Sequence, residues 1–153
     1  MASGPTGFPT LQPAFILKEM SSGTITTVEG FEPKLELEVV YGGDWFYIDP
    51  DQEHGRVNVR GIARTADGVT ISYAYIGSVA SNDDIRAIFS HSPDAKTHPF
   101  GQTSSTLTFE VGPGKLKSLE NCTWVGNGRF VVGKDTIWVE TRVSKLVPST
   151  DMD

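Results

Sequence analysis

The sequence predicts an all-β protein, a single closed antiparallel β-barrel of about eight to ten strands, lipocalin-like in shape, with one short helix. Hydrophobic and polar residues alternate with a period of two along much of the chain. The 153 residues include 16 glycines and 9 prolines, which separate short segments in the manner of hairpin turns. Strands joined by hairpins must hide their edges, and closure of the sheet into a barrel does so.

The first strand candidates are short and cover residues 15–18, 35–40 and 45–49. The clearest hairpin follows them and joins 56–64 to 70–76. Asp67-Gly68 lies between these two runs and can supply the positive φ angles of a tight turn. Because side chains of a regular strand alternate between two faces, Tyr73 and Tyr75 should point the same way, into the barrel.

One segment has helical spacing. Asn82 can cap it, Asp83 and Asp84 place negative charge in its first turn, and Pro93 limits its length, so we expect a helix overlapping 83–90. Three further strands are predicted over 104–111, 123–132 and 136–146, the last two joined as a second hairpin. We expect one barrel domain over 13–147, with flexible tails at 1–12 and 148–153.

Composition and charge exclude several classes of function. The net charge of −6 and pI of about 5.0 disfavour binding to nucleic acid or to an anionic membrane. The N-terminus lacks a secretory signal, and the single cysteine excludes an internal disulfide, so we expect a cytoplasmic protein. No motif for ATP, NAD or zinc is present, and the three histidines lack metal-site spacing. We therefore predict no metal and no cofactor.

Four stretches, in order, carry a family resemblance. They are GGDW at 42–45, TADGVTISYAYIG at 65–77, TFEVG at 108–112 and LENCTWVGNGRFVV at 119–132, which continues into IWVETRVSKLV at 137–147. Together they resemble the domain-of-unknown-function 3237 family of small bacterial and fungal proteins. The segment SPDAKTHPFG at 92–101 is similar to the fungal branch in particular.

The resemblance implies a closed antiparallel barrel whose activity is mostly unassigned. It also implies a setting in secondary metabolism, because small fungal barrels of this kind often accompany natural-product pathways. Cofactor-free isomerases, cyclases and pericyclases occur in that setting. Asn58 stands where bacterial relatives tend to carry Asp, which weakens any Asp–Arg pair at this strand.

Three charged residues are candidates for catalysis. Arg60 lies mid-strand, and we expect its guanidinium to lie inside the barrel, hydrogen-bonded to a carboxylate, with Asp44 and Glu140 as the leading partners, or to a ligand oxygen. Asp44 follows two glycines and precedes a tryptophan, where partial desolvation would suit a proton shuttle. Glu140 could act as a general base. Each has a structural alternative: an outward Arg60, an Asp44 that caps a turn, and a Glu140 in an ion pair.

A second set of residues could bind a substrate. Tyr73 and Tyr75 can contact an apolar ligand and donate a hydrogen bond, or they can simply pack in the barrel. Asn58 shares a strand face with Arg60. The remaining candidates for the lining are aromatic: Trp45, Trp124, Trp138 and Phe109.

The leading hypothesis is a cofactor-free isomerase or cyclase, including a Diels–Alderase-like pericyclase, that holds a small apolar natural-product intermediate inside the barrel. The alternatives are a non-catalytic carrier barrel and a structural protein with a filled interior. The expected partner is a small apolar molecule rather than nucleic acid or membrane, and homodimer formation is left open.

Overall fold

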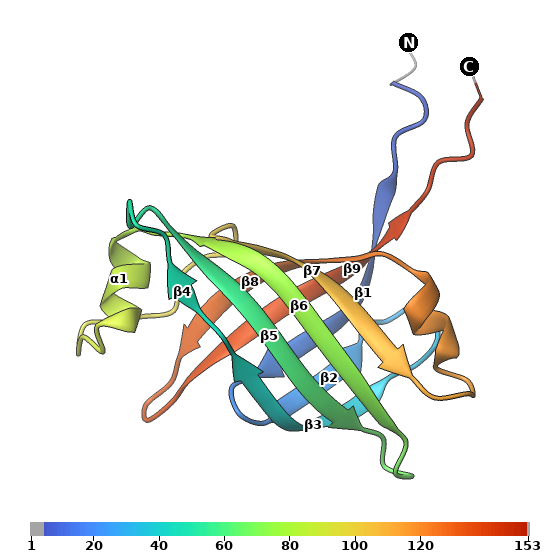
Figure 1. The fold of residues 1–153 in the computed structure, drawn as a ribbon, viewed down its shortest axis with the longest axis horizontal. Helices are drawn as coiled ribbons and strands as arrows, with labels where there is room; N and C mark the ends of the chain where they lie inside the picture. The colour runs from blue at the N-terminus through green and yellow to red at the C-terminus, as the bar shows by residue number, and fades with distance from the viewer. Residues whose placement is uncertain (1–4, 153) are drawn as a thin grey trace.

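The computed structural model describes residues 5–152 and confirms the predicted fold. Figure 1 shows a closed antiparallel barrel with helix α1 (Asp83–Phe89) at one end. The strands are β1 (Thr10–Glu19), β2 (Gly23–Thr27), β3 (Glu36–Asp44), β4 (Tyr47–Ile48), β5 (His54–Arg64), β6 (Thr70–Ala80), β7 (Thr103–Val111), β8 (Trp124–Val132) and β9 (Ile137–Val147). A 3₁₀ helix, η1 (Lys117–Asn121), lies at the other end of the barrel.

Eight of the strands close the barrel in the order β3-β2-β1-β9-β8-β7-β6-β5, and pairing of β3 with β5 completes the ring. The short strand β4 pairs with β5 beyond the end of β3. The β5–β6 hairpin runs without a register shift from His54 opposite Ala80 to Arg64 opposite Thr70. Its tip contains Gly68, whose φ of +90° is the left-handed geometry expected of the Asp-Gly turn.

Two elements were not predicted from the sequence. Strand β2 contains one buried apolar side chain, Ile25, among threonines, so its alternation is too weak to identify it. The 3₁₀ helix η1 has only Leu119 buried. Strand β1 also begins at Thr10, inside the segment predicted as a tail. Residues 1–4 and 153 of the predicted tails lie outside the described residues.

The predicted helix is present. The side chain of Asn82 accepts a hydrogen bond from the backbone N–H of Ile85 at 2.9 Å, which satisfies one of the free donors of the first turn. Ile85 and Ile88 are buried, so the helix packs its apolar face against the barrel. α1 thereby covers one end of the barrel.

Aromatic side chains fill the opposite half of the interior. The rings of Phe15 and Trp124 lie 4.8 Å apart, and Phe31 and Phe109 pack edge-on against this pair. The indole of Trp124 donates to the carbonyl of Leu119 at 2.9 Å, which joins η1 to the core. Aromatic rings therefore occupy the interior of the barrel near η1.

A β-bulge in β3 decides which side chains enter the α1 half. Val39 pairs with Ala63 and Tyr41 with Ile62, so Val40 is an extra residue in the strand. Beyond the bulge the alternation is reversed. Asp44, opposite the inward-facing Val59, therefore lies on the inner face of the wall.

Gly61 makes room for the ring of Tyr73. A Cβ at position 61 would lie 2.2 Å from Tyr73 Cζ, closer than any real contact. We expect Gly61→Ala to displace the Tyr73 ring and lower the free energy of unfolding by about 1–3 kcal/mol, measured by urea denaturation. Gly112→Ala is the matched control, since no atom lies within 4 Å of that Cβ, and it should change stability by less than about 0.5 kcal/mol. Equal stabilities of the two variants would contradict this packing argument.

Candidate functional site

A cavity of about 260 Å³ lies at the end of the barrel covered by α1. Most of its lining is apolar and comes from the barrel wall, from Phe46 and from the helix. The lining residues are Glu19, Met20, Gly43, Asp44, Phe46, Val59, Tyr75, Ile88, Phe89, His91, Phe130, Ile137 and Val139. Two carboxyl groups therefore face an otherwise largely hydrophobic space, the arrangement typical of a small-molecule site.

Glu19 is the most buried polar group of this cavity. It ends β1 on the same face as Phe15 and Leu17, and only 4% of its surface is exposed. The hydroxyl of Tyr75 donates to Glu19 Oε1 at 2.5 Å, and the hydroxyl of Tyr73 donates to Oε2. Among the described residues, no Lys, Arg or His forms an ion pair with Glu19.

Burial controls the ionisation of this cluster. Desolvation raises the pKa of Glu19, and the nearby charge of Asp44 raises it further, while the hydrogen bonds from Tyr73 and Tyr75 oppose the shift. Burial and the Glu19 carboxylate raise the pKa values of both tyrosines. The phenols therefore stay protonated as donors, and Glu19 holds its proton to a higher pH than an ordinary carboxyl group.

Asp44 is the second carboxyl group; it lines the open side of the cavity, and this residue is exposed to solvent. Its Oδ1 accepts the backbone N–H of Asn58 at 3.0 Å, which ties it to β5. Partial burial raises the pKa of Asp44, against the effect of that hydrogen bond. Two carboxyl groups in one apolar cavity, one deep and one near solvent, can exchange protons with a bound molecule.

The prediction that Arg60 lies inside the barrel is wrong. Arg60 is exposed on the outer face of β5, while its neighbours Val59 and Gly61 point inward. The alternation itself was identified correctly, but the apolar and small residues form the inner face because burying unpaired guanidinium groups would cost too much. Arg60 pairs with neither Asp44 nor Glu140 and is removed from the site.

The predicted lining residues divide into three groups. Tyr73 and Tyr75 point inward, as expected, with 2% and 6% of their surface exposed. Trp124 and Phe109 belong to the solid half of the core and do not reach the cavity. The third group, Trp45, Asn58 and Trp138, does not face inward. Trp45 follows the β3 bulge and is 62% exposed, and Asn58 lies on the outer face of β5 with Arg60. Trp138 lies on the outer face of β9, because its neighbour Val139 lines the cavity.

Glu140 also lies outside the barrel, on the outer face of β9, although it is only 5% exposed. Its Oε1 accepts from Arg142 at 2.6 Å and its Oε2 from Arg129 at 3.0 Å. The ring of Phe100 lies 4.5 Å from the Arg129 guanidinium and helps to cover the group. Burial alone would raise the pKa of Glu140, but the two guanidinium groups outweigh it and lower that pKa. This is the ion pair that the sequence left open as the structural alternative.

The segment between α1 and β7 is fixed next to the cavity. His98 is buried, and its Nε2 accepts the backbone N–H of Phe130 at 3.0 Å. Thr97 accepts the N–H of Val132 at 2.9 Å in the same way. These bonds attach the segment to β8 at Phe130, whose ring lines the cavity.

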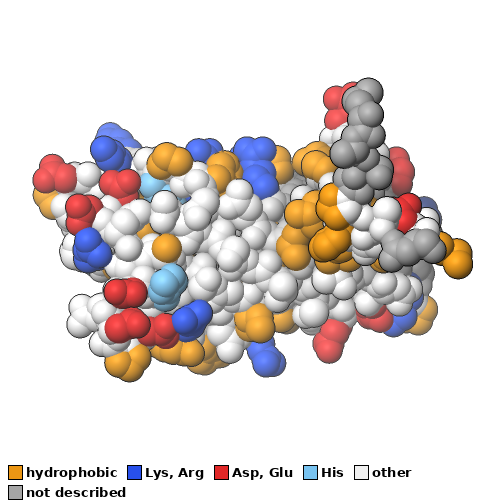
Figure 2. Space-filling model, turned by 90° about the horizontal axis from the view of Figure 1, so that it is seen from above, with side chains coloured by type: hydrophobic (Ala, Val, Ile, Leu, Met, Phe, Trp, Pro, Cys, Tyr) orange, Lys and Arg blue, Asp and Glu red, His pale blue; other side chains and the backbone are white. Residues whose placement is uncertain are grey.

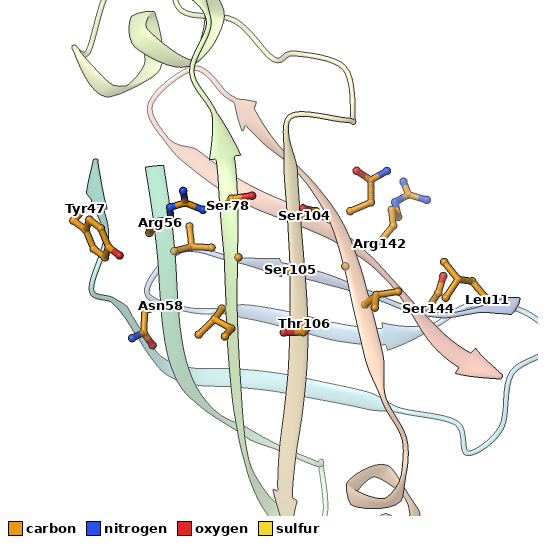
Figure 3. Close-up of a pocket in the computed structure, with 16 residues that line it drawn as sticks. Leu11, Tyr47, Arg56, Asn58, Ser78, Ser104, Ser105, Thr106, Arg142 and Ser144 are labelled. Carbon is orange, nitrogen blue, oxygen red and sulfur yellow. The ribbon is translucent and has the colours of Figure 1, made fainter. Parts of the chain in front are cut away.

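A second hollow runs over the outer surface of the barrel. Figure 3 shows Arg56 and Arg142 at its two sides, with Ser78, Ser104 and Thr106 between them. Arg56 is paired with Asp49 at 2.6 Å and Arg142 with Glu140, so the two cations already have partners. This groove is wide and open, about 890 Å³, and it contains no buried charged group, which makes it a weaker candidate than the internal cavity.

The exposed charges do not form a basic patch on the face seen in Figure 2, where Lys and Arg side chains are scattered around a centre that is neither charged nor hydrophobic. Within residues 5–152, no group of three or more His, Cys, Asp or Glu side chains could hold a metal ion. In the same part of the chain, no helix is long and apolar enough to cross a membrane.

The family model for a protein of unknown function, DUF3237, matches residues 9–146. The chain belongs to this family. No curated protein matches the chain.

Solved structures support the family fold. A conserved protein of unknown function from Rhodopseudomonas palustris has 15% identity and a TM-score of 0.71, covering 94% of this chain and all of its own (100%). A protein of unknown function from Clostridium acetobutylicum has 16% identity and a TM-score of 0.66, covering 91% and 99%. A β-barrel-like protein from Acinetobacter baumannii has 17% identity and a TM-score of 0.60, covering 95% and 99%. At these identities the three solved structures show the fold alone.

Sequence reasoning missed Glu19, the central residue of this DUF3237 cavity. The predicted strand stopped at residue 18, one position short. The signal was present, because a period of two places Glu19 on the apolar face of Phe15 and Leu17. An acidic residue at the end of an apolar strand face was the available clue.

The Glu140 ion pairs should stabilise the fold without serving the cavity. Glu140→Ala leaves two guanidinium groups without their shared acceptor and weakens the packing of Arg129 against the Phe100 ring. We expect a loss of about 1–3 kcal/mol in the free energy of unfolding, measured by denaturant titration. Because both arginines are partly exposed, the loss should fall below that of a fully buried pair. A Glu140→Ala protein as stable as wild type would contradict this role.

The raised pKa of Glu19 predicts a pH dependence of stability. A carboxyl group whose folded pKa is raised stabilises the fold fully below its unfolded pKa, and that stability is lost as the pH rises through the folded pKa. The free energy of unfolding should therefore fall from mildly acidic pH upward, and Glu19→Gln should lack this part of the decline. Urea titrations of both proteins over a pH series test this. Parallel pH profiles would show that Glu19 ionises normally.

Proposed function

We propose that this protein is a cofactor-free isomerase or cyclase that acts by proton transfer on a small, largely apolar natural-product intermediate held in the cavity. One observation carries the proposal. Glu19, a deeply buried carboxyl group without a cationic partner, faces an apolar cavity and is oriented by two phenols. Buried acids with shifted pKa values are characteristic of general acid–base sites.

Glu19 would give or take the proton at the reacting carbon or oxygen of the substrate. Tyr73 and Tyr75 fix both carboxylate oxygens and stabilise the negative charge that forms when Glu19 loses its proton. Asp44, nearer the solvent, opposes ionisation of Glu19 through its own charge and offers a second site for the proton. The pair supports removal of a proton at one position and its return at another.

The cavity walls would supply the positioning that cyclisation requires. The rings of Phe46 and Phe89 lie stacked at 4.9 Å, and Phe130 meets Phe89 edge-on at 5.5 Å. A flexible substrate packed against this continuous aromatic wall would be held in a compact conformation. Positioning of this kind can supply several kcal/mol of the rate enhancement, including that of a pericyclic step.

A carrier without catalysis is the second candidate, favoured by how little polar surface the lining offers. The two functions differ in one measurable respect. A carrier binds its ligand unchanged, whereas an acid–base enzyme exchanges protons with it.

Proton exchange therefore tests the proposed function. The protein is incubated in deuterium oxide with tetralone, a bicyclic ketone with acidic C–H groups, and deuterium uptake is followed by NMR. We expect wild type to accelerate exchange and Glu19→Gln to reduce the rate by about 10²–10⁴-fold, because the amide cannot carry the proton. Asp44→Asn should reduce it to a smaller extent.

The matched control is Glu38→Gln, which removes one exposed carboxylate from the outer face of β3. It should exchange tetralone at the wild-type rate. Circular dichroism and thermal melting verify that each variant is folded. Binding of tetralone without accelerated exchange would favour the carrier, and equal rates for wild type and Glu19→Gln would refute the role of Glu19.

A further inference from the structure

The charges around the cavity are unbalanced. Among the residues that the structure describes, Glu19 accepts hydrogen bonds only from neutral phenols, and Asp44 only from a backbone N–H. No Lys or Arg is among the lining residues, and the one basic residue there, His91, is exposed. Elsewhere in this barrel buried acid is matched by cations, since Glu140 is paired with both Arg129 and Arg142.

The rest of the cavity suits an organic cation. Phe46, Phe89 and Phe130 form one wall, and Tyr75 adds a fourth ring. Aromatic rings attract an ammonium group through their electron-rich faces and also accept an apolar body. Glu19 gains most from such a ligand because the attraction acts in a desolvated space, whereas the exposed Asp44 contributes less.

From the cavity, its aromatic wall and its two uncompensated carboxyl groups, we propose that the ligand is an apolar amine, bound as its ammonium ion with the nitrogen directed at Glu19 and Asp44. The proposal deepens the proposed function, on whose site it rests, by naming the substrate class. An anionic ligand such as a carboxylate or phosphate would be repelled by the two carboxyl groups when they are ionised and is disfavoured.

The substrate class fits the proposed chemistry. The carboxyl groups that bind an ammonium ion would equally bind a protonated imine, so a substrate that already carries a C=N bond would enter the site as an iminium ion with no oxidation required. Glu19 could then remove a proton from the carbon next to that charge. The electron pair of the broken C–H bond would neutralise the iminium nitrogen and give an enamine, and the proton would reside on Glu19 until it is returned to another carbon.

Three probes of matched size test the proposal by isothermal titration calorimetry at neutral pH. They are naphthylmethylamine, naphthylmethanol and naphthoate, which present a cation, a neutral group and an anion on the same bicyclic body. We expect the amine to bind about tenfold or more tightly than the alcohol. Naphthoate should show no measurable binding.

Variants locate the source of this preference. Glu19→Gln should bring the affinity for naphthylmethylamine down to that for naphthylmethanol, and Asp44→Asn should reduce it in part. Neither variant should change the affinity for the alcohol. Glu38→Gln lowers the net negative charge of the protein equally and should bind all three probes as wild type does.

Three results would overturn the proposal: equal or tighter binding of the alcohol, an amine preference that survives in both Glu19→Gln and Asp44→Asn, or no binding of any probe. The calorimetry requires no turnover, so its outcome is separate from that of the exchange assay. Exchange of tetralone combined with a preference for naphthylmethanol would leave the acid–base function standing and remove the amine. An amine preference without exchange of tetralone would support the amine as ligand and remove the acid–base function.

Discussion

The buried carboxyl group of Glu19 imposes the constraint on which the site depends. A carboxylate taken out of water must be hydrogen-bonded, neutralised or paired with a cation, and here two phenols supply hydrogen bonds while burial raises the pKa of Glu19. Tyr73 and Tyr75 supply a donor to each oxygen, and each such bond to a charged group contributes about 1.5–3 kcal/mol. The Tyr73 ring reaches Glu19 only because Gly61 leaves space beneath it. Hydrogen bonding to Glu19 therefore constrains the positions of Gly61, Tyr73 and Tyr75, which lie far from it in the chain.

The two halves of the barrel contribute differently to that site. The aromatic cluster around Phe15 and Trp124 fills the η1 half and holds β1 in place, so that Glu19 at the end of β1 has a defined position. The α1 half is left hollow. The bulge at Val40 then turns Asp44 into this hollow and Trp45 out of it. A rigid core beside an open cavity is the arrangement that positions functional groups well.

The sequence predicts the fold better than it predicts the site. Alternation locates most strands and the inward direction of Tyr73 and Tyr75, and helical spacing with the Asn82 cap locates the helix, because all of these depend on local sequence. The prediction for Arg60 was wrong. Val57 and Val59 are apolar and form the inner face of β5, so Arg60 lies on the outer face. The bulge at Val40 cannot be recognised from the spacing of apolar residues in the sequence. The contact of Glu19 with two tyrosines more than fifty residues away depends on closure of the barrel, which no local pattern specifies.

The carboxyl groups of Glu19 and Glu140 are both buried, but they have different hydrogen-bond partners. Glu140 on the outer wall is neutralised by two guanidinium groups, and its pKa is lowered despite burial. Glu19 is buried to the same degree, yet phenols take the place of cations and its pKa is raised. The two guanidinium groups offset part of the cost of burying the Glu140 carboxylate. Under the proposed function, the arrangement at Glu19 keeps an acid that can still exchange its proton and still attract a cation. A purely structural or carrier barrel would not require this property, whereas the proposed acid–base site would depend on it.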